Sequence, residues 1–432
     1  MATIVAITAV PLLMATAMGV DYGLAVDAQA KLNSYADSAA LAAVTPPMMT
    51  QTVAAAQTAA QNTFSSQAST VNLVTYVPSN LNVTITTSGG KRTATVAYTA
   101  AYTMVFPNIL GMTTINLKGS SSATAGMSPN INFYLLMDTS PSMAIPATQA
   151  GINAMMAATP TQNSGGCAFA CHQTNPGADS LHNPNGEDNY ALARSLSIVL
   201  RIDLLKSAAQ NLILTAQNKE AQNQATYNMG FYSFDVNFNT LQSLTSIPSS
   251  SSSTPVSSPA YTAASNVTML PVYKNNWLTS TNNNGDADTN YDAGMSGING
   301  VMPNPGSGTT TPGDTPQEVL FFVTDGVEDE ATSGGGRQQS LMDNGWCTTI
   351  KNRGIRIAVL YTEYLPIPND NWYMGYGYSE TYPVNTFQSS IASQLQNCAS
   401  SGLFYEVQTG GDISAALTSL FQLSVQSAYL SN

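Results

Sequence analysis

An apolar segment at residues 133–137 is followed directly by Asp138, Ser140 and Ser142, in the pattern Asp-x-Ser-x-Ser. The aspartate and the two hydroxyls place three short oxygen side chains on one tight turn after a predicted strand. A hard divalent cation such as Mg²⁺ prefers oxygen ligands at about 2.0–2.1 Å in octahedral geometry. Because three positions on one turn cannot complete that shell, the sequence predicts further ligands at the ends of neighbouring strands.

Two later segments can supply those ligands. A second apolar run, residues 318–323, leads into Thr-Asp-Gly at 324–326, which is typical of a buried parallel strand entering a loop. Thr289 lies at a predicted helix start, where Asp288 is the expected cap. The candidate metal ligands are therefore Asp138, Ser140, Ser142, Thr289 and Asp325.

In this order, the five positions resemble the metal-ion-dependent adhesion site of von Willebrand factor type A domains. The resemblance implies that Ser140, Ser142 and Thr289 bind the metal directly, whereas Asp138 and Asp325 act largely through water. It also implies Mg²⁺, or else Ca²⁺ or Mn²⁺, and an open position for a carboxylate from a protein ligand. The alternative is a strand-end turn that has the motif without binding metal.

The elements around the motif alternate between helix and strand patterns. Apolar residues at spacing four predict an amphipathic helix over residues 194–217, and apolar runs at 227–234 and 355–361 predict strands. This alternation is typical of a doubly wound α/β sheet, whose ligand sites lie at the carboxyl ends of the strands. We therefore expect a Rossmann-like type A domain over residues 128–432, with the metal motif at that edge.

The amino terminus predicts a membrane anchor. Residues 1–20 contain no charged side chain, and a helix of that length spans about 30 Å, the thickness of a bilayer core. The pattern continues as a small-residue amphipathic helix until two prolines at 46–47 stop it. The sequence predicts a stem helix over residues 1–48, with a kink or a break at Pro11.

An apolar helix that continues into an amphipathic one is the arrangement of a pilin stem. The stem, the metal motif and a cysteine-bearing loop together resemble the TadG-type proteins of Tad (tight adherence, Flp) pili. The resemblance implies other pilus or pilin-like subunits as partners. It also implies an exported protein, either anchored in the inner membrane and facing the periplasm or located in an extracellular pilus at the cell surface.

Two features of the stem depart from related proteins. Type IV pilins carry a glutamate at the fifth position of the mature chain, where this chain has Val5, so it lacks the charge pair by which such pilins pack. A secretory signal peptide begins with basic residues, but the first basic residue here is Lys31. We therefore expect that Met1 is not the original start of the chain.

Residues 49–127 predict a small α+β pilin-like unit. Residues 50–67 are rich in Ala and Gln and favour a helix, and alternating apolar residues on both sides of Gly89-Gly90 predict a β-hairpin. A third strand is expected at 113–117, followed by a linker rich in Ser, Ala and Gly at 119–129. The expected fold is thus a long helix with a small antiparallel unit, followed by the type A domain.

Four cysteines indicate two disulfides, because an even number in an exported chain most simply pairs. We expect Cys167 with Cys171, which are close in sequence, and Cys347 with Cys398, which remain. Four cysteines allow three pairings, and the sequence does not choose among them. The first pair lies in a predicted insertion near residues 157–190.

The loop with the first two cysteines allows other chemistry. Cys167, Cys171 and His172 differ by one residue from the Cys-x-x-Cys-His motif of covalent haem attachment, which would make the chain an electron-transfer protein. A zinc site that adds His182 is a further alternative. The two disulfides are preferred to both. His172 and His182 are the only histidines, so the sequence gives catalysis little support and we expect no enzyme.

The charge balance limits the partners. Thirteen basic and 25 acidic residues give a formal net charge of −12 and a pI near 4.4, whereas nucleic-acid binding needs clustered Lys and Arg. Aromatic residues crowd into residues 361–382, as either a contact surface or a loop packed on its domain. The expected function is surface attachment or Tad pilus assembly through a metal-dependent type A domain. The alternative is a filament-forming subunit in which that domain is a structural shell.

Overall fold

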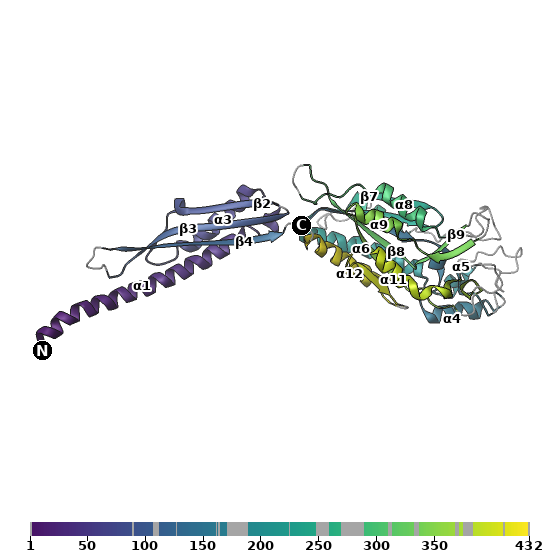
Figure 1. The fold of residues 1–432 in the computed structure, drawn as a ribbon, viewed down its shortest axis with the longest axis horizontal. Coiled ribbons are helices and arrows are strands. Elements are labelled where there is room, and N and C mark those ends of the chain that lie inside the picture. Colours follow the sequence, from purple (N-terminus) through teal and green to yellow (C-terminus); the bar gives the residue numbers. More distant parts are fainter. Residues whose placement is uncertain are drawn as a thin grey trace. The chain divides into compact units, whose positions relative to one another are not determined.

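The computed structural model describes the chain except residues 1, 89, 107–111, 127, 161, 163–164, 171–188, 224, 248–258, 269–288, 310–312, 332–336, 368–370, 375–382, 409–410 and 431–432. The chain divides into two compact units, residues 1–128 and residues 129–431 (Figure 1). We call them the amino-terminal unit and the carboxyl-terminal unit.

The amino-terminal unit combines a long helix with an antiparallel sheet. Its helices are α1 (Ala2–Ala42), α2 (Pro46–Met49), α3 (Val53–Ala68) and the short 3-10 helix η1 (Pro78–Asn80). Its strands are β1 (Val74–Thr75), β2 (Leu81–Ser88), β3 (Lys91–Thr103) and β4 (Thr114–Gly126). Every pairing in this sheet is antiparallel, and the long strand β3 pairs with each of the other three. The α+β composition and the hairpin at Gly90 agree with the expectation.

Only the second half of α1 packs against the sheet. Buried positions recur every three or four residues from Asp21 onward, whereas none of the side chains described from Thr8 to Val20 is buried. The helix continues through Pro11, so the expected break is wrong. A single proline removes one backbone hydrogen bond, and the turns on either side keep this helix continuous.

The expected linker at residues 119–129 is wrong for most of its length. Residues up to Gly126 belong to β4, which pairs with β3 over the whole of both strands. Hydroxyl side chains link the two strands, with 2.8 Å between Thr95 Oγ1 and Ser122 Oγ. Small residues fit here because their hydroxyls pair across the strands, a contribution that linker composition rules do not consider.

A six-stranded sheet forms the centre of the carboxyl-terminal unit. Its order is β12-β11-β8-β5-β6-β7, with only the edge strand β7 antiparallel. The strands are β5 (Ile131–Asp138), β6 (Tyr227–Phe234), β7 (Phe238–Ser246), β8 (Gln317–Thr324), β11 (Arg356–Thr362) and β12 (Phe404–Val407). A separate hairpin consists of β9 (Val327–Ala331) and β10 (Arg337–Leu341).

Helices cover both faces of this sheet. They are α4 (Gln149–Ala158), α5 (Asn189–Ser195), α6 (Arg201–Asn223), α7 (Pro259–Thr268), α8 (Tyr291–Val301), α9 (Gly345–Asn352), α10 (Asn371–Met374), α11 (Gln388–Cys398) and α12 (Ile413–Leu430), with 3-10 helices η2 (Pro141–Ala144) and η3 (Val384–Thr386). Alternate residues of β5 enter opposite cores, as its buried position in the middle of the sheet requires. The predicted doubly wound α/β fold is confirmed.

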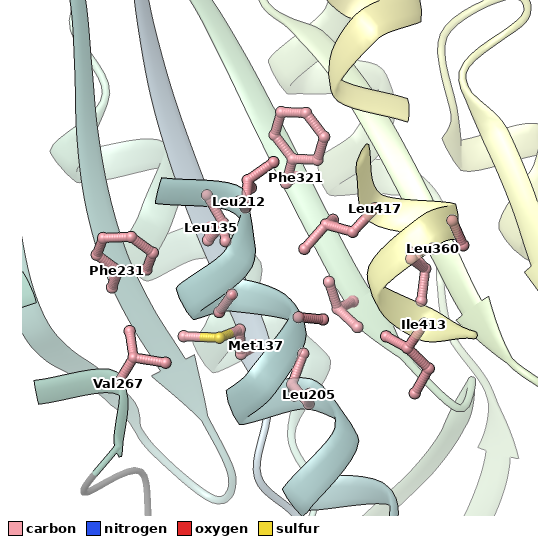
Figure 2. Close-up of a cluster of buried hydrophobic side chains, with 14 of the residues drawn as sticks. Leu135, Met137, Leu205, Leu212, Phe231, Val267, Phe321, Leu360, Ile413 and Leu417 are labelled. Atoms are coloured by element: carbon pink, nitrogen blue, oxygen red, sulfur yellow. The ribbon is translucent and has the colours of Figure 1, made fainter. Parts of the chain in front are cut away.

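One core lies between the sheet and the helices α6, α7 and α12. Figure 2 shows Leu205 and Leu212 of α6 and Leu417 of α12 among side chains of the central strands, including Leu135 and Phe321. The opposite core packs α8, α9 and α11 on the sheet. Burying aliphatic and aromatic side chains on both faces fixes the positions of the strand ends, where the candidate ligands lie.

The expected helix over residues 194–217 is two helices. Helix α5 ends at Ser195, and α6 begins at Arg201. Between them, Leu200 forms an isolated β-bridge with Pro146, and the Asp203 carboxylate accepts a hydrogen bond of 2.9 Å from the Leu200 N–H. A side chain that reaches back to the residue before a helix caps its first turn, so α6 starts here although the leucine spacing continues upstream.

A disulfide joins α9 to α11. Cys347 and Cys398 are bonded, with their Cα atoms 5.1 Å apart, and both side chains are buried. This pair is one of the two that the sequence predicts. It links two helices that pack on the same face of the sheet.

Candidate metal centre

Two adjacent parallel strands deliver the candidate ligands to one edge of the sheet. Strand β5 ends at Asp138 and β8 ends at Thr324, and Met137 lies beside Val323 in the register. The residues that follow each strand therefore meet at the carboxyl edge of the sheet. This arrangement brings Asp138, Ser140, Ser142 and Asp325 together, although the two segments are far apart in the sequence.

Hydrogen bonds fix the Asp138 carboxylate. Its Oδ1 accepts from the Ser140 N–H at 2.9 Å, and its Oδ2 accepts from the Thr324 hydroxyl at 2.7 Å. The Ser140 and Ser142 hydroxyl oxygens lie 3.0 Å apart. The first bond closes the turn after β5, so the turn itself holds both hydroxyls on the same side as the aspartate.

Asp325 has three different partners. Its Oδ2 lies 3.3 Å from Nη1 of Arg201, and its Oδ1 accepts from the Val327 N–H at 3.4 Å. The Ser142 side chain also bonds to this carboxylate, which connects the two motif segments. Because Asp325 is fully buried, the guanidinium compensates a charge that water does not reach.

Thr289 is buried and is joined by its backbone to β9, and the structure gives no contact between it and the other four candidate ligands among the described residues. Its N–H and C=O exchange hydrogen bonds of 3.0 and 2.9 Å with Asp329. The cap of α8 is Asn290, whose side-chain oxygen accepts from the Ala293 N–H, so the expectation of Asp288 as the cap is wrong. Asp288 itself lies outside the described residues. Tyr291, the first residue of α8, shares a hydrogen bond of 2.5 Å between its hydroxyl and that of Thr324, and this bond connects the start of α8 to the motif.

The two aspartates carry an electrostatic cost. Burial raises the pKa of Asp138, and the neighbouring Asp325 raises it further. Burial also raises the pKa of Asp325, although Arg201 opposes that rise. The pKa of Tyr291 is raised well above its ordinary value by burial and by both carboxylates. In all three groups burial is the largest cause, so this buried edge disfavours negative charge that is not compensated.

Arg201 is a buried residue of the site that the sequence motifs do not indicate. Its side chain is 5% exposed, its Nη2 donates to the Glu363 carbonyl oxygen at 2.7 Å, and its guanidinium lies 5.5 Å from the centre of the Tyr364 ring. The residue is the first of α6, and its partner Asp325 is 124 positions away in sequence. The chain has only 13 basic residues, so an arginine within a predicted core helix was a signal that it pairs with a buried acidic residue.

The donors present fit a hard divalent cation. They are hydroxyl and carboxylate oxygens, which suit Mg²⁺, Ca²⁺ or Mn²⁺ better than softer metals. Within the described part of the chain, no three His, Cys, Asp or Glu side chains are grouped to hold a metal. A cation at this edge would therefore depend on the hydroxyls of the motif as well as on its two carboxylates.

The cysteine-bearing loop is described only in part. Cys167 is buried, and its N–H donates to the Thr159 hydroxyl at 2.8 Å. Cys171, His172 and His182, on which the first disulfide and the haem and zinc alternatives depend, lie outside the described residues. This loop belongs to a longer segment between Pro146, shortly after the motif, and Leu200, and these two residues form a β-bridge that closes the segment at its base.

The aromatic segment contributes to the body of its unit where it is described. Tyr361, Tyr364 and Tyr373 are buried, and the rings of Tyr364 and Tyr373 stack with their centres 6.3 Å apart. This agrees with a packed loop for these three residues. Tyr376, Tyr378 and Tyr382 lie outside the described residues.

The strand order, the two covered faces and the motif at the carboxyl edge define a doubly wound α/β domain, and the same chain carries an amino-terminal unit with a long helix and an antiparallel sheet. Residues 1–63 match the family model described as "Putative Flp pilus-assembly TadE/G-like". The amino terminus is thus similar to TadE/G-like Flp pilus-assembly proteins, which is the resemblance that the sequence predicts. No curated protein sequence matches the chain.

The solved structures that are similar to the chain include two pilus proteins and a protein of the mussel byssus. The pilus adhesin SpaC from Lactobacillus rhamnosus GG is 10% identical, with a TM-score of 0.37, over 81% of this chain and 34% of that one. The vWF domain of the type V pili tip protein Mfa5 from Porphyromonas gingivalis is 8% identical, with a TM-score of 0.36, over 71% and 97%. Proximal thread matrix protein 1 from the mussel byssus, with a zinc-occupied MIDAS motif, is 12% identical, with a TM-score of 0.32, over 69% and 46%. The chain spans about a third of the SpaC structure.

Proposed function

We propose that this protein presents a divalent-metal-dependent type A domain for surface attachment or pilus assembly. The observation that carries the proposal is the pair of hydroxyls, Ser140 and Ser142, held 3.0 Å apart beside two buried carboxylates. Its amino-terminal helix would anchor it in the inner membrane, facing the periplasm, or in a pilus fibre. One helix among the described residues, within Thr8–Ala42, is long and apolar enough to cross a membrane by length and composition.

Five residues would hold the cation. Ser140, Ser142 and Thr289 would bind it directly, and Asp138 and Asp325 would act largely through water. Bound there, the cation would supply a Lewis-acidic position for a carboxylate oxygen of a protein ligand. The protein's own contribution is the fixed turn: the Ser140 N–H and the Thr324 hydroxyl hold Asp138 in place before any ion arrives. This role is binding, so we propose that the protein is not an enzyme.

Metal titration of the purified chain tests the proposal. Calorimetry with Mg²⁺ and Mn²⁺ should detect one site, and Ser140→Ala or Asp138→Ala should weaken the affinity by about 10–100-fold, the loss typical of changed ligands and their supporting groups. Surface attachment or pilus assembly should decrease with the same variants and with EDTA.

Thr139→Val provides the matched control. Thr139 lies between Asp138 and Ser140 and is buried, and its hydroxyl donates to the Phe234 carbonyl oxygen of the neighbouring strand at 2.9 Å. Its replacement should leave metal affinity unchanged. If Ser140→Ala binds metal as wild type does, or if attachment is indifferent to EDTA, the metal-dependent function is wrong.

A second candidate function is a filament-forming, pilin-like subunit in which the type A domain is a structural shell. The ion pair between Arg201 and Asp325 favours it, because the guanidinium compensates a buried carboxylate without any metal. In that case ordered fibres of the native protein would form equally well in EDTA. Electron microscopy with and without chelator separates the two candidates.

A further inference from the structure

The tip of the β3–β4 hairpin is fastened to the stem helix at one residue. Asp21 of α1 is fully buried, and its two carboxylate oxygens accept hydrogen bonds from the Val105 N–H at 2.7 Å and the Phe106 N–H at 2.9 Å. Val105 and Phe106 lie two and three residues after the end of β3, and the structure describes the chain again from Met112, shortly before β4. A buried carboxylate that accepts two backbone N–H groups fixes the position of the segment that donates them.

Asp21 also marks a boundary along α1. It is the first charged residue of the chain and the first buried one described in this helix. Before it, the helix exposes apolar side chains such as Leu12, Leu13 and Val20. Charged side chains are costly in a bilayer core, so the proposed membrane segment ends near Asp21. The hairpin tip therefore lies at the level where the helix would leave the hydrocarbon.

The tip exposes apolar side chains at that level. Val105, Phe106 and Met112, which we call the tip patch, are 45%, 47% and 51% exposed. No charged residue occurs in the sequence from 105 to 117. The first charge beyond the tip, Lys118, is held by its backbone to the Gln29 side chain, eight positions along α1 from Asp21 and so about 12 Å farther from the boundary.

We propose that the tip patch is a second membrane contact, which lies in the interface of the bilayer that α1 enters. Segments that bind in this region bury their apolar side chains about 5–10 Å into the boundary between headgroups and acyl chains. Asp21 accepts the backbone N–H groups of Val105 and Phe106, holds the tip patch beside α1 and so acts as the positioning residue. Two contacts, one through α1 and one through the tip patch, would set the orientation of the amino-terminal unit on the membrane. This inference rests on the membrane anchoring in the proposed function.

Fluorescence quenching by brominated lipids tests the proposal. The full chain is reconstituted in phosphatidylcholine and phosphatidylglycerol vesicles. Three variants each carry one added tryptophan at an exposed position. They are Phe106→Trp in the tip patch, Leu13→Trp in the stem and Ser88→Trp in β2, beside the start of β3 and therefore far from the tip patch. Ser88 pairs with Lys91, and the 12 steps of β3 from there to Thr103 span about 40 Å. The wild-type chain, with its own three tryptophans, gives the baseline.

We expect brominated lipid to remove most of the added fluorescence in Phe106→Trp and Leu13→Trp, and none of it in Ser88→Trp. Adding Asp21→Ala should reduce quenching at position 106 and leave it unchanged at position 13. Quenching at Leu13→Trp without quenching at Phe106→Trp overturns the tip contact and leaves the anchor intact. Absence of quenching at both positions overturns the anchor as well. Blue-shifted Phe106→Trp emission that brominated lipid does not quench would assign the patch to another copy of the protein instead.

Discussion

Replacing Arg201 by methionine should make the carboxyl-terminal unit depend on divalent metal for its stability. Methionine keeps much of the volume of the side chain but removes the charge next to Asp325. Two adjacent buried carboxylates, Asp138 and Asp325, then have no basic side chain in contact among the residues that the structure describes. The energetic consequence should be large because both members of the Arg201–Asp325 pair are buried.

The magnitude follows from that burial. Removing one partner of a buried ion pair costs about 3–5 kcal/mol, because the other charge stays without compensation. The side chains of Arg201 and Asp325 are 5% and 0% exposed, so water does not reduce this cost much. Divalent metal at about 100 times its dissociation constant should raise the free energy of unfolding by about 2.7 kcal/mol if it binds only the folded state. Protonation also neutralises the carboxylates, so the loss should be smaller at pH 5 than at pH 8.

Urea unfolding followed by tryptophan fluorescence measures these effects. Trp277, Trp346 and Trp372 all belong to the carboxyl-terminal unit, so their emission reports on that unit alone. We expect Arg201→Met to lose about 3–5 kcal/mol in EDTA and to regain more on addition of Mg²⁺ than the wild type gains.

Arg194→Met is the matched control, since Arg194 pairs with Asp203 at the surface, where the two side chains are 37% and 25% exposed. An exposed pair contributes about 0–1 kcal/mol, and Mg²⁺ should not change the effect of this variant. If Arg201→Met costs no more than Arg194→Met in EDTA, then Arg201 is not the charge that compensates the site, and the electrostatic reasoning above is refuted.

Three further predictions concern stability. Burial raises the pKa of Glu318 to about 7, so the folded protein binds this proton more tightly than the unfolded chain and loses stability as pH rises from about 4.5 through 7. In urea unfolding, Glu318→Gln should therefore be more stable than wild type at pH 8, by about 1–3 kcal/mol, and equal to it at pH 5. Cys347→Ser removes a disulfide that spans 51 positions and should lower the free energy of unfolding by about 2–4 kcal/mol, whereas wild type treated with reductant should match the variant. Gly326 has φ of +81°, and an added Cβ would lie 2.3 Å from Ile391, so Gly326→Ala should lower the free energy of unfolding by more than about 1 kcal/mol. An unchanged melting temperature in thermal unfolding would contradict this.

The central strands were predictable because each one is an apolar run of strand length. The run at 227–234 coincides with β6, which is buried along most of its length. Burial on both faces of a parallel sheet leaves this pattern in the sequence directly. The edge of the sheet that carries the motif follows from the same rule, since ligand sites of doubly wound sheets lie at the carboxyl ends of the strands.

Tertiary contacts decided what the sequence did not reveal. The start of α6 depends on the bridge between Pro146 and Leu200, which joins segments that no local pattern connects. The long strand β4 is stabilised by hydroxyls that pair with β3, although its composition is typical of a linker. Arg201 faces Asp325 because α6 packs on the face of the sheet whose core also contains residues of β8, and spacing along the chain contains no sign of this.

The bridge between Pro146 and Leu200 has a consequence for how the protein can change over time. The segment from Pro146 to Leu200 begins and ends beside the candidate metal site, because these two residues pair with each other. An excursion closed at its base can lengthen, shorten or exchange its sequence while the strands beneath it keep their register. The protein therefore has a position where new recognition loops can be acquired beside an existing binding edge, without a new fold and without moving the residues that would bind the ion.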